Sequence, residues 1–357
     1  MRTVFFLLLL LVPVYLYLGW SLAAAGYQWF ILGVPFLLLL TFPFKKLHRS
    51  QLHLIYLSMG ILSYLTILTA LRDLIAALTT SRATDSIVYV LTTLALFYGH
   101  WNALSGPRLK NISVSYAGLP PGLDGLKIAQ ISDLHVGPTI RKEYVEKTVT
   151  LVNSVDPDII ALTGDIGDGP PKLFREDCAP LWKLRSKLGA FYVPGNHEYY
   201  WGINEWLGLI NNLGIVVLLN RGKILQHGEK KILIGGIPDS VSSLLPDPGA
   251  ILEAGLESDF RILLSHRPGY AEVASLQGWN LQLSGHTHGG QFFPWTIAVR
   301  FFHEVSVGLK KKKEMWLYVS PGTGSWGPLL RLGTTPEVTV LTLRTLSNTP
   351  ETERYLE

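Results

Sequence analysis

The sequence predicts an α/β domain preceded by an N-terminal bundle of about four transmembrane helices. Four long apolar segments lie in the first hundred residues, and the whole chain is 48% hydrophobic but only 16% charged. From about Asn111 onward, glycine and proline become frequent, and short apolar runs alternate with amphipathic stretches. Strands that alternate with helices in this way indicate an α/β domain. We expect a transmembrane anchor at residues 1–106, the α/β domain at residues 107–345 and a polar tail at residues 346–357.

Composition narrows the possible classes of function. The single cysteine, Cys178, excludes an intramolecular disulfide and a cysteine-based metal cage. Cys178 follows the expected start of a helix, and we expect its side chain to fill space in the packing rather than to act as a nucleophile. The formal net charge of +4 is too small and too scattered to indicate a nucleic-acid partner.

The anchor consists of four apolar segments, each close to the ~20 residues that a bilayer crossing requires. They are Val4–Trp20, Tyr27–Phe44, Leu52–Leu71 and Ile87–Leu104. The first could instead be a signal peptide, since Arg2, an apolar stretch and three alanines at 23–25 fit that pattern. In either case the basic loop at residues 45–49 should be cytoplasmic. We expect a multi-pass protein of the plasma (inner) membrane whose α/β domain is cytoplasmic.

The strands of the α/β domain are predicted from its short apolar runs. These runs are Leu126–Ile131, Asp158–Leu162, Ala190–Val193, Ile215–Leu219, Lys231–Ile234, Arg261–Leu264, Leu281–Leu283, Trp316–Val319 and Val338–Leu343. Helical patterns lie between several of them, at Arg141–Asn153, Pro180–Leu188 and Asn204–Leu213.

Five of these runs end in residues that can bind a metal ion. The residues are Asp133 and His135 after the first run, Asp165 after the second, Asn196 after the third, His266 after the sixth, and His286 with His288 after the seventh. In α/β sheets, ligands bind beyond the carboxyl ends of the strands. Five such ends in series therefore predict one metal site.

The residue types indicate which ions the site would take. Carboxylate, amide and imidazole ligands without a thiolate suit Mn, Fe, Zn or Mg-like ions. Asp165 can bridge two ions, with Asp133, His135 and His288 on the first and Asn196, His266 and His286 on the second. Two divalent ions about 3.5–4 Å apart form the usual clamp for displacement at phosphorus, and one of them turns a bound water into hydroxide.

The motifs that carry these residues resemble the calcineurin-like metallophosphoesterase superfamily. They are Asp-x-His at 133–135, Gly-Asp-x-x-Asp at 164–168, Gly-Asn-His-Glu at 195–198, the lone His266, and Gly-His-x-His at 285–288. The resemblance extends from about Lys127 to Leu343. The exact residues in and around these motifs are similar to those of a bacterial membrane-associated subgroup. This subgroup includes UDP-diacylglucosamine pyrophosphohydrolases and cell-wall-associated phosphodiesterases. The resemblance implies a sandwich of two packed β-sheets flanked by helices.

The resemblance also implies a role for each matched residue. Asp133, His135, Asp165 and His288 match the ligands of the first metal, and Asp165, Asn196, His266 and His286 match those of the second. His197 matches the histidine that contacts the phosphoryl group and protonates the leaving oxygen. Asp168 matches a residue that does not bind metal itself but holds the residues of the site in position. Glu198 stands where many members have Asp. Arg267, next to a ligand, either holds a phosphate or is an ordinary loop charge.

The segment from Phe292 to Lys313 bears on the substrate. Phe292, Phe293 and Trp295 follow the last histidine motif, and then Lys310, Lys311, Lys312 and Lys313 stand together. One interpretation makes the aromatics strand core and the lysines a solvated hairpin turn. The other makes the segment an apolar lip on the bilayer, with each lysine drawn to anionic headgroups by ~1 kcal/mol.

These observations lead to one expected function and two alternatives. We expect a membrane-anchored dinuclear-metal phosphoesterase that hydrolyses a phosphodiester or pyrophosphate bond by metal-bound hydroxide. Its expected partners are the lipid bilayer and an amphiphilic phosphoester, such as the lipid-linked nucleotide UDP-2,3-diacylglucosamine, and no nucleic acid. The alternatives are a tethered nucleotide or protein phosphatase, and a non-catalytic membrane sensor or scaffold.

Overall fold

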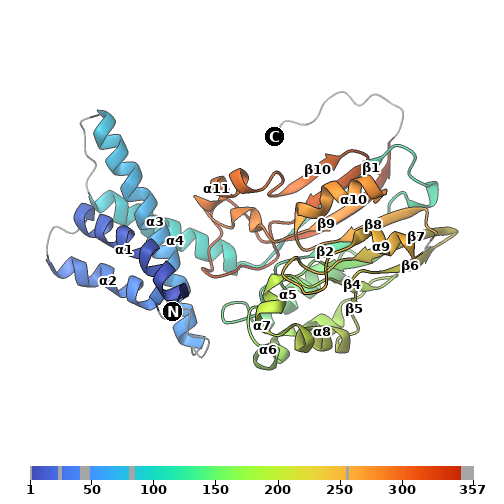
Figure 1. Cartoon of the computed structure of the whole chain (residues 1–357), viewed down its shortest axis with the longest axis horizontal. Helices are drawn as coiled ribbons and strands as arrows, with labels where there is room; N and C mark the ends of the chain where they lie inside the picture. Colours follow the sequence, from blue (N-terminus) through green and yellow to red (C-terminus); the bar gives the residue numbers. More distant parts are fainter. Residues whose placement is uncertain (1, 23–25, 41–48, 80–84, 255–256, 347–357) are drawn as a thin grey trace.

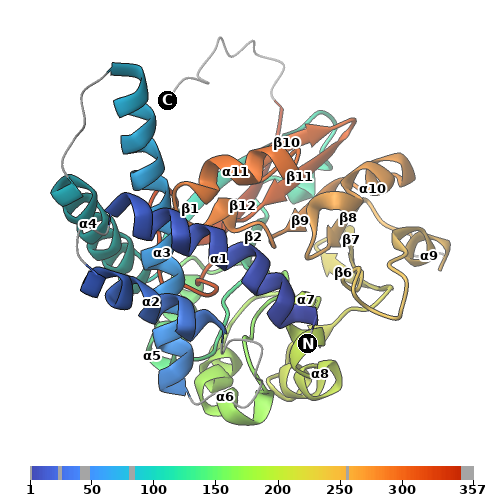
Figure 2. The ribbon, with the colours of Figure 1, turned by 60° about the vertical axis from the view of Figure 1, so that its left-hand side comes forward.

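A computed structural model describes residues 2–22, 26–40, 49–79, 85–254 and 257–346 of the chain. It consists of a group of N-terminal helices beside a domain of two β-sheets (Figures 1 and 2). The last N-terminal helix ends at Leu104, and the first strand begins at Arg108. The polar tail expected at residues 346–357 lies almost wholly outside the described residues.

The N-terminal part contains four helices, of which two could cross a membrane. The helices are α1 (Arg2–Leu22), α2 (Gly26–Leu40), α3 (Arg49–Thr79) and α4 (Asp85–Leu104). Within the described residues, only Gln51–Thr79 and Asp85–Leu104 are long and apolar enough to span a bilayer, and a shorter apolar helix covers Leu11–Leu22. The expectation of four spanning helices is therefore not confirmed: α2, for example, has 15 residues, fewer than the ~20 that a crossing needs.

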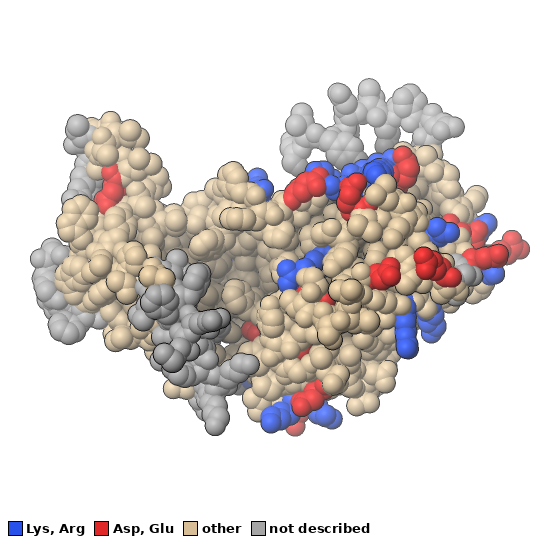
Figure 3. Space-filling view, viewed as in Figure 1, with Lys and Arg blue, Asp and Glu red and all other residues tan. Residues whose placement is uncertain are grey.

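The helical part exposes many large apolar side chains, such as Leu16, Leu78 and Phe97. On the face that Figure 3 shows, its described residues include few charged side chains, whereas charged side chains are frequent on the two-sheet domain. The buried side chain of Arg72 pairs with Asp73 and Asp85 and so ties α3 to α4. Most of the basic loop expected to set the orientation, residues 45–48, lies outside the described residues.

The domain is built on two six-stranded mixed sheets, which confirms the expected pair of sheets. The first has the order β1-β12-β2-β3-β4-β5, and the second has the order β10-β11-β9-β8-β7-β6. Their bounds are β1 (Arg108–Tyr116), β2 (Lys127–Ile131), β3 (Ile159–Leu162), β4 (Ala190–Tyr192), β5 (Val216–Val217), β6 (Arg221–His227), β7 (Lys230–Gly236), β8 (Phe260–Leu264), β9 (Leu281–Ser284), β10 (Gly308–Lys312), β11 (Met315–Val319) and β12 (Glu337–Thr345). A buried apolar layer that includes Ile128, Phe191, Ile262 and Leu283 joins the two sheets.

Three strands were not anticipated from the sequence, and all three lie at sheet edges. They are β1, β6 and β10. Each carries many polar residues because an edge strand is covered on fewer sides than a central one. A search for apolar runs finds the buried central strands and the apolar edge strand β5, but it misses these three polar edges.

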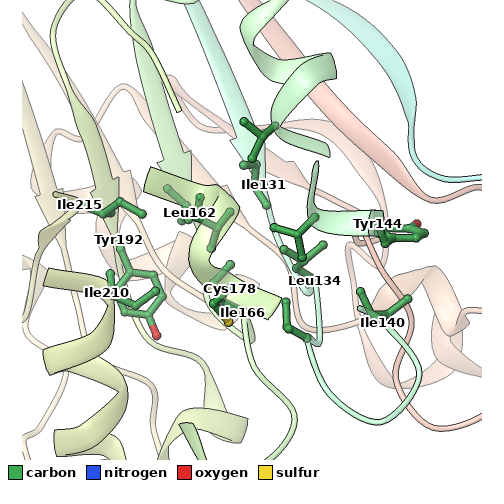
Figure 4. Close-up of a cluster of buried hydrophobic side chains, with 14 of the residues drawn as sticks. Ile131, Leu134, Ile140, Tyr144, Leu162, Ile166, Cys178, Tyr192, Ile210 and Ile215 are labelled. Atoms are coloured by element: carbon green, nitrogen blue, oxygen red, sulfur yellow. The ribbon is translucent and has the colours of Figure 1, made fainter. Parts of the chain in front are cut away.

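Helices cover the outer faces of both sheets. The first sheet is covered by α5 (Lys142–Asn153), α6 (Pro171–Cys178) and α8 (Ile203–Asn212), which bury the cluster of Figure 4 against β2, β3 and β4. The second is covered by α9 (Pro248–Glu253) and α10 (Ala271–Gln277). The remaining helices are α7 (Asn196–Trp201) and α11 (Trp295–Phe302). The helix expected at Pro180–Leu188 is instead a short 3-10 turn at Ala179–Lys183, since Leu184 is already extended.

The loop at residues 328–334 docks the domain onto the N-terminal helices α3 and α4. Leu330 lies where α3 and α4 carry glycines: a Cβ on Gly60 would stand 2.6 Å from its side chain and one on Gly99 3.3 Å. The backbone N–H of Arg331 donates to the Gly99 carbonyl (2.9 Å), and the Asn102 side chain donates to the Arg331 carbonyl (2.8 Å). The anchor and the domain therefore share a close-packed interface.

Candidate metal centre

The carboxyl ends of five parallel strands bring all seven expected ligand residues together. Strands β2, β3 and β4 of the first sheet deliver Asp133, His135, Asp165 and Asn196, and strands β8 and β9 of the second deliver His266, His286 and His288. The two sheets pack through their shared core, so their strand ends meet at one rim. Residues separated by as much as 155 positions become neighbours for this reason.

The ligand atoms form two groups. In the first, Nε2 of His288 lies 3.0 Å from Nε2 of His135 and 3.4 Å from Oδ1 of Asp133. In the second, Nε2 of His266 lies 3.2 Å from Nδ1 of His286 and 3.3 Å from the Asn196 side-chain oxygen.

Asp165 lies between the two groups. Its Oδ2 is 3.3 Å from Nε2 of His266 and 3.7 Å from Nε2 of His135. A carboxylate in this place can contact ions in both groups, as the sequence motif implied.

Electrostatics favours the form of these histidines that binds metal. Burial, followed by the nearby His197 charge, lowers the pKa of His135 to about 3. Burial and the charges of His266 and Arg267 lower the pKa of His286 to about 2. Both rings are therefore neutral at physiological pH, and a neutral imidazole is the ligating form. The donor set fits divalent cations.

His266 differs from His135 and His286 because its ring is positively charged, but the ring is also oriented to bind a metal ion. Burial opposes its protonation, but the Asp165 carboxylate outweighs burial and raises its pKa to about 10. Its Nδ1 donates to the carbonyl of Thr163 (2.8 Å), which fixes the ring with Nε2 facing the site.

The backbone of the site is held in an uncommon conformation. Five of the seven expected ligands have positive φ angles: Asp133 (51°), His135 (52°), Asp165 (51°), His286 (72°) and His288 (52°). Residues with a side chain avoid this left-handed region, and such strain persists where the surroundings fix it, often at functional sites. The fold thus maintains the arrangement at an energetic cost.

Two glycines allow the loops to approach each other closely. A Cβ on Gly195 would lie 2.2 Å from Oδ1 of Asp165, and one on Gly285 would lie 2.1 Å from Oδ2 of Asp133. The backbone N–H of His286 also donates to Asp133 (3.0 Å). No side chain larger than hydrogen fits at either glycine without moving a ligand.

Glu198 is buried below the ligands and joins two of their loops. Its Oε1 accepts hydrogen bonds from the backbone N–H groups of Ile166 (2.6 Å) and Gly167 (3.1 Å). Its Oε2 accepts from the backbone N–H groups of Asp165 (3.0 Å) and Gly195 (2.7 Å). Glu198 therefore sets the distance between the loop of Asp165 and the loop of Asn196.

His197 lies beside the two ligand groups. Its Nδ1 contacts Oδ1 of Asp168 (2.9 Å), and its Nε2 lies 4.0 Å from Oδ2 of Asp165. Burial disfavours its protonation, but the charges of Asp165 and Asp168 outweigh burial and raise its pKa to about 9. The ring is therefore charged at neutral pH and can donate a proton.

Asp168 has further partners that the motifs did not indicate. Its Oδ1 also accepts from the Trp201 indole N–H (3.2 Å), and its Oδ2 accepts from the phenol of Tyr56 on α3 (3.3 Å). A residue of α3 thus contacts the carboxylate that holds the His197 ring. No local motif marks Tyr56, which lies 112 positions away in the sequence.

Two arginines complete the surroundings. Arg267 is held by Asp239 (2.9 Å), and its guanidinium lies 2.9 Å from Nε2 of His286 and 3.4 Å from the Asn196 side-chain oxygen. It therefore points into the site. The fully buried Arg331 lies 3.4 Å from Nδ1 of His288 and donates to the Pro321 carbonyl (2.7 Å). Only Arg267 had a sequence signal, its position after His266.

The aromatic half of the expected lip divides into a buried part and an exposed part. Phe292 is buried against Tyr64 of α3, with ring centroids 5.7 Å apart, and Phe293 is half-buried. Trp295 begins α11 and is 49% exposed, while Phe301 and Phe302 at the end of that helix are 84% and 82% exposed.

The lysines of the expected lip belong to a hairpin. Lys310, Lys311 and Lys312 lie in β10, and Lys313 lies in the turn that follows. All four have glutamate partners: Lys310 and Lys312 pair with Glu304, Lys311 with Glu314, and Lys313 with Glu272. Blue and red atoms accordingly alternate over β10 in Figure 3. Four lysines and three glutamates leave a local charge of +1.

Comparisons with known proteins agree with the motifs. The family described as Calcineurin-like phosphoesterase matches residues 126–290. A transmembrane protein with metallophosphoesterase domain from Bos taurus is 35% identical over 275 residues, which cover 72% of this chain and 62% of that protein. Uncharacterized metallophosphoesterases from Campylobacter jejuni and Aquifex aeolicus are 35% and 34% identical, and the matches cover 71% and 68% of this chain and 68% and 93% of those proteins.

Among solved structures, the 5'-nucleotidase precursor from Thermus thermophilus aligns with 57% of this chain and 49% of its own at 18% identity and a TM-score of 0.36. The chain spans 62% of the length of the transmembrane relatives from Bos taurus and Danio rerio. Because the relatives come from animals as well as bacteria, they support the family more strongly than the narrower bacterial subgroup.

Proposed function

Because this chain belongs to the calcineurin-like phosphoesterase family, we propose that it is a metal-dependent hydrolase that cleaves a phosphodiester or pyrophosphate bond at the membrane. The observation that carries this proposal is the convergence of seven metal-binding side chains and His197 at one rim of the two sheets. A scaffold that had lost its activity would have no need to keep strained backbone at five of those residues.

The ligand geometry supports two metal ions per chain, with Asp165 shared between them. Asp133, His135 and His288 would hold the first ion, and Asn196, His266 and His286 the second. Bound divalent ions supply Lewis acidity and neutralise charge on the phosphoryl group. Manganese, iron, zinc and magnesium all remain candidates, since these ligands accept each of them.

The chain's own residues complete the proposed chemistry. Arg267 is placed to bind a phosphoryl oxygen, because its guanidinium already reaches the second ligand group. His197 is placed to protonate the leaving oxygen as the bond to phosphorus breaks. Asp168, fixed by Trp201 and Tyr56, holds the His197 ring in position through Nδ1.

The substrate that we propose is amphiphilic, for example a lipid or a lipid-linked nucleotide such as UDP-2,3-diacylglucosamine. The site lies beside α3, whose Tyr56 reaches Asp168, so a phosphoester at the membrane surface is close to the ligands. The exposed aromatic side chains of α11 add apolar surface beside the site.

We further propose a multi-pass anchor in the plasma membrane, with α3 and α4 among its crossings and with the domain in the cytoplasm. Protection of the domain from protease outside sealed right-side-out vesicles would support this topology, and its cleavage there would contradict it.

Activity of the purified full chain tests the proposal. The protein is stripped with a chelator, reloaded separately with each of the four metals, and assayed on UDP-2,3-diacylglucosamine, a phospholipid, a nucleotide and a phosphopeptide. We expect metal-dependent hydrolysis of a lipid-linked substrate, lost in Asn196→Ala and His286→Ala but kept in His227→Ala, a histidine on edge strand β6.

Two results would contradict parts of the proposal. Hydrolysis only of the nucleotide or the phosphopeptide would replace the lipid substrate by a soluble one. If no substrate of the panel is hydrolysed with any of the metals, the remaining function is that of a non-catalytic sensor or scaffold.

A further inference from the structure

We propose that a cavity between α3 and the metal centre binds an alkyl chain of the substrate, so that the membrane helix forms part of the binding site. This inference rests on the proposed phosphoesterase function and specifies its substrate. The cavity has a volume of about 400 Å³, within the range of ordinary ligand pockets. Met59 and Ser63 of α3 line one side, and His286 and His288 line another.

Most of the remaining cavity wall is apolar. The apolar part includes Phe292, Trp295, Trp326 and Pro328, and none of the lining residues within the described chain is Asp, Glu, Lys or Arg. A cavity of this composition disfavours a charged or strongly polar occupant, because such a group would lose its hydration without a compensating partner.

The polar side chains that do line the cavity are already engaged. The Gln291 amide nitrogen donates to the carbonyls of Trp326 (2.9 Å) and Pro328 (2.8 Å), and its oxygen accepts from the Trp326 backbone N–H (2.8 Å). The Ser63 hydroxyl donates to the Met59 carbonyl (2.8 Å). Away from the histidines, a ligand therefore meets mostly hydrocarbon, and the Gln291 and Ser63 side chains already have hydrogen-bond partners, which suits an alkyl chain.

Two parts of the lining determine what can occupy the cavity. One part contains two expected metal ligands, His286 and His288, where a phosphoryl group would bind. The other part belongs to α3, which exposes Leu54 and Leu57 on its outer surface. A lipid phosphoester joins these chemistries in one molecule: its head lies at the ligands, and its chain lies along α3.

Two contacts hold α3 beside the site. Gly60, next to Met59, packs against Leu330, and Tyr56, one turn earlier, contacts Asp168. The helix therefore cannot move away from the site without breaking both contacts. The cavity is a built feature of the interface between the anchor and the domain.

Chain-length dependence of hydrolysis tests the inference. The probes are methyl, octyl and tetradecyl para-nitrophenyl phosphodiesters, which share the reacting group and differ only in the alkyl chain. For the full chain in detergent we expect kcat/KM to rise with chain length, by up to about fourfold for each methylene that enters the cavity. The ratio of tetradecyl to methyl kcat/KM is the quantity compared between variants.

Ser63→Phe places a ring in the cavity and should lower this ratio at least about tenfold, since several methylenes are displaced. Thr79→Phe is the matched control: it makes the same kind of change at an exposed position near the end of α3, and it should keep the wild-type ratio. Met59→Ala, which enlarges the cavity, should shift the preference toward the longest chain. A tetradecyl phosphate with a terminal diazirine should crosslink to the peptides that contain Met59 or Trp326.

The possible failures are distinguishable. If the wild type hydrolyses the methyl ester but shows no dependence on chain length, the phosphoesterase function stands and the cavity inference is refuted. Equal ratios in Ser63→Phe and Thr79→Phe, or crosslinks confined to other segments, would also refute it. If no ester is hydrolysed with any metal, the proposed function fails and this inference fails with it.

Discussion

The substitution Glu198→Gln tests whether one buried carboxylate holds the metal-binding loops together. Each carboxylate oxygen of Glu198 accepts two backbone N–H groups, from Ile166 and Gly167 on one side and from Asp165 and Gly195 on the other. Glutamine has nearly the same shape but replaces one oxygen by an NH₂ group. Two backbone donors then lose their acceptor and face another donor.

The structure gives the size of the expected effect. Each buried N–H left without a partner costs about 1–3 kcal/mol, so two cost about 2–6 kcal/mol. For a domain of this size, the fall in melting temperature is about 2–4 °C per kcal/mol. Metal affinity should fall as well, because two of the four donors belong to Asp165 and to the neighbour of Asn196.

The assay is thermal and urea unfolding of the full chain in detergent, with bound metal counted by mass spectrometry. The pH is kept above the pKa of Glu198, which burial and the Asp165 charge raise to about 7, so that the side chain is ionised in the wild type. Metal is supplied at one fixed concentration, because bound metal stabilises the folded state. Glu205→Gln, at an exposed site on α8, is the control and should change stability by less than about 0.5 kcal/mol. A Glu198→Gln protein that matches this control in stability and metal content would refute the role given to Glu198.

Four further substitutions or reactions test other parts of the site. Gly285→Ala should lower bound metal, because a Cβ there displaces a ligand, whereas Gly208→Ala, in open space on α8, should leave it unchanged; equal metal content in the two would contradict the close approach. His197→Ala should keep its metal while kcat falls about 10²–10⁴-fold, and loss of the bound metal would contradict the role of proton donor proposed for His197. Tyr56→Phe removes one hydrogen bond to the carboxylate that positions His197, so kcat should fall less than about tenfold; a fall as large as that of His197→Ala would show that the phenol does more. The Cys178 thiol, whose pKa is raised by burial, should resist a thiol reagent until the protein is denatured, and fast labelling of the folded protein would show that α6 opens.

The candidate ligands could be located from the sequence because each signal is local. Asp133 and His135 are two residues apart, as are His286 and His288, and each pair follows directly on an apolar run. The rule that ligands bind beyond strand ends then places the pairs together without any knowledge of distant contacts. The central strands were found for a related reason, since burial on both faces leaves a continuous apolar run.

The supporting residues could not be found in this way because their partners are distant in the sequence. Arg331 reaches His288 across 43 positions, and Tyr56 reaches Asp168 across 112. The lysine run shows the same difficulty: the sequence displays four adjacent positive charges, but Glu272, one of their partners, comes from α10. Charge and hydropathy patterns report composition along the chain, whereas neutralisation depends on which segments the sheets place side by side.

The contacts of α3 and α4 show that these two N-terminal helices touch the surroundings of the candidate metal centre at two places. Tyr56 of α3 reaches the carboxylate that positions His197, next to the ligands from the first sheet. Gly99 of α4 holds the backbone of Arg331, whose side chain lies against His288 from the second sheet. One contact thus reaches the part of the site built on the first sheet, and the other reaches the part built on the second. A helix that only tethered the domain would need a linker and no such contacts, so the arrangement is better explained if the anchor is a structural part of the site.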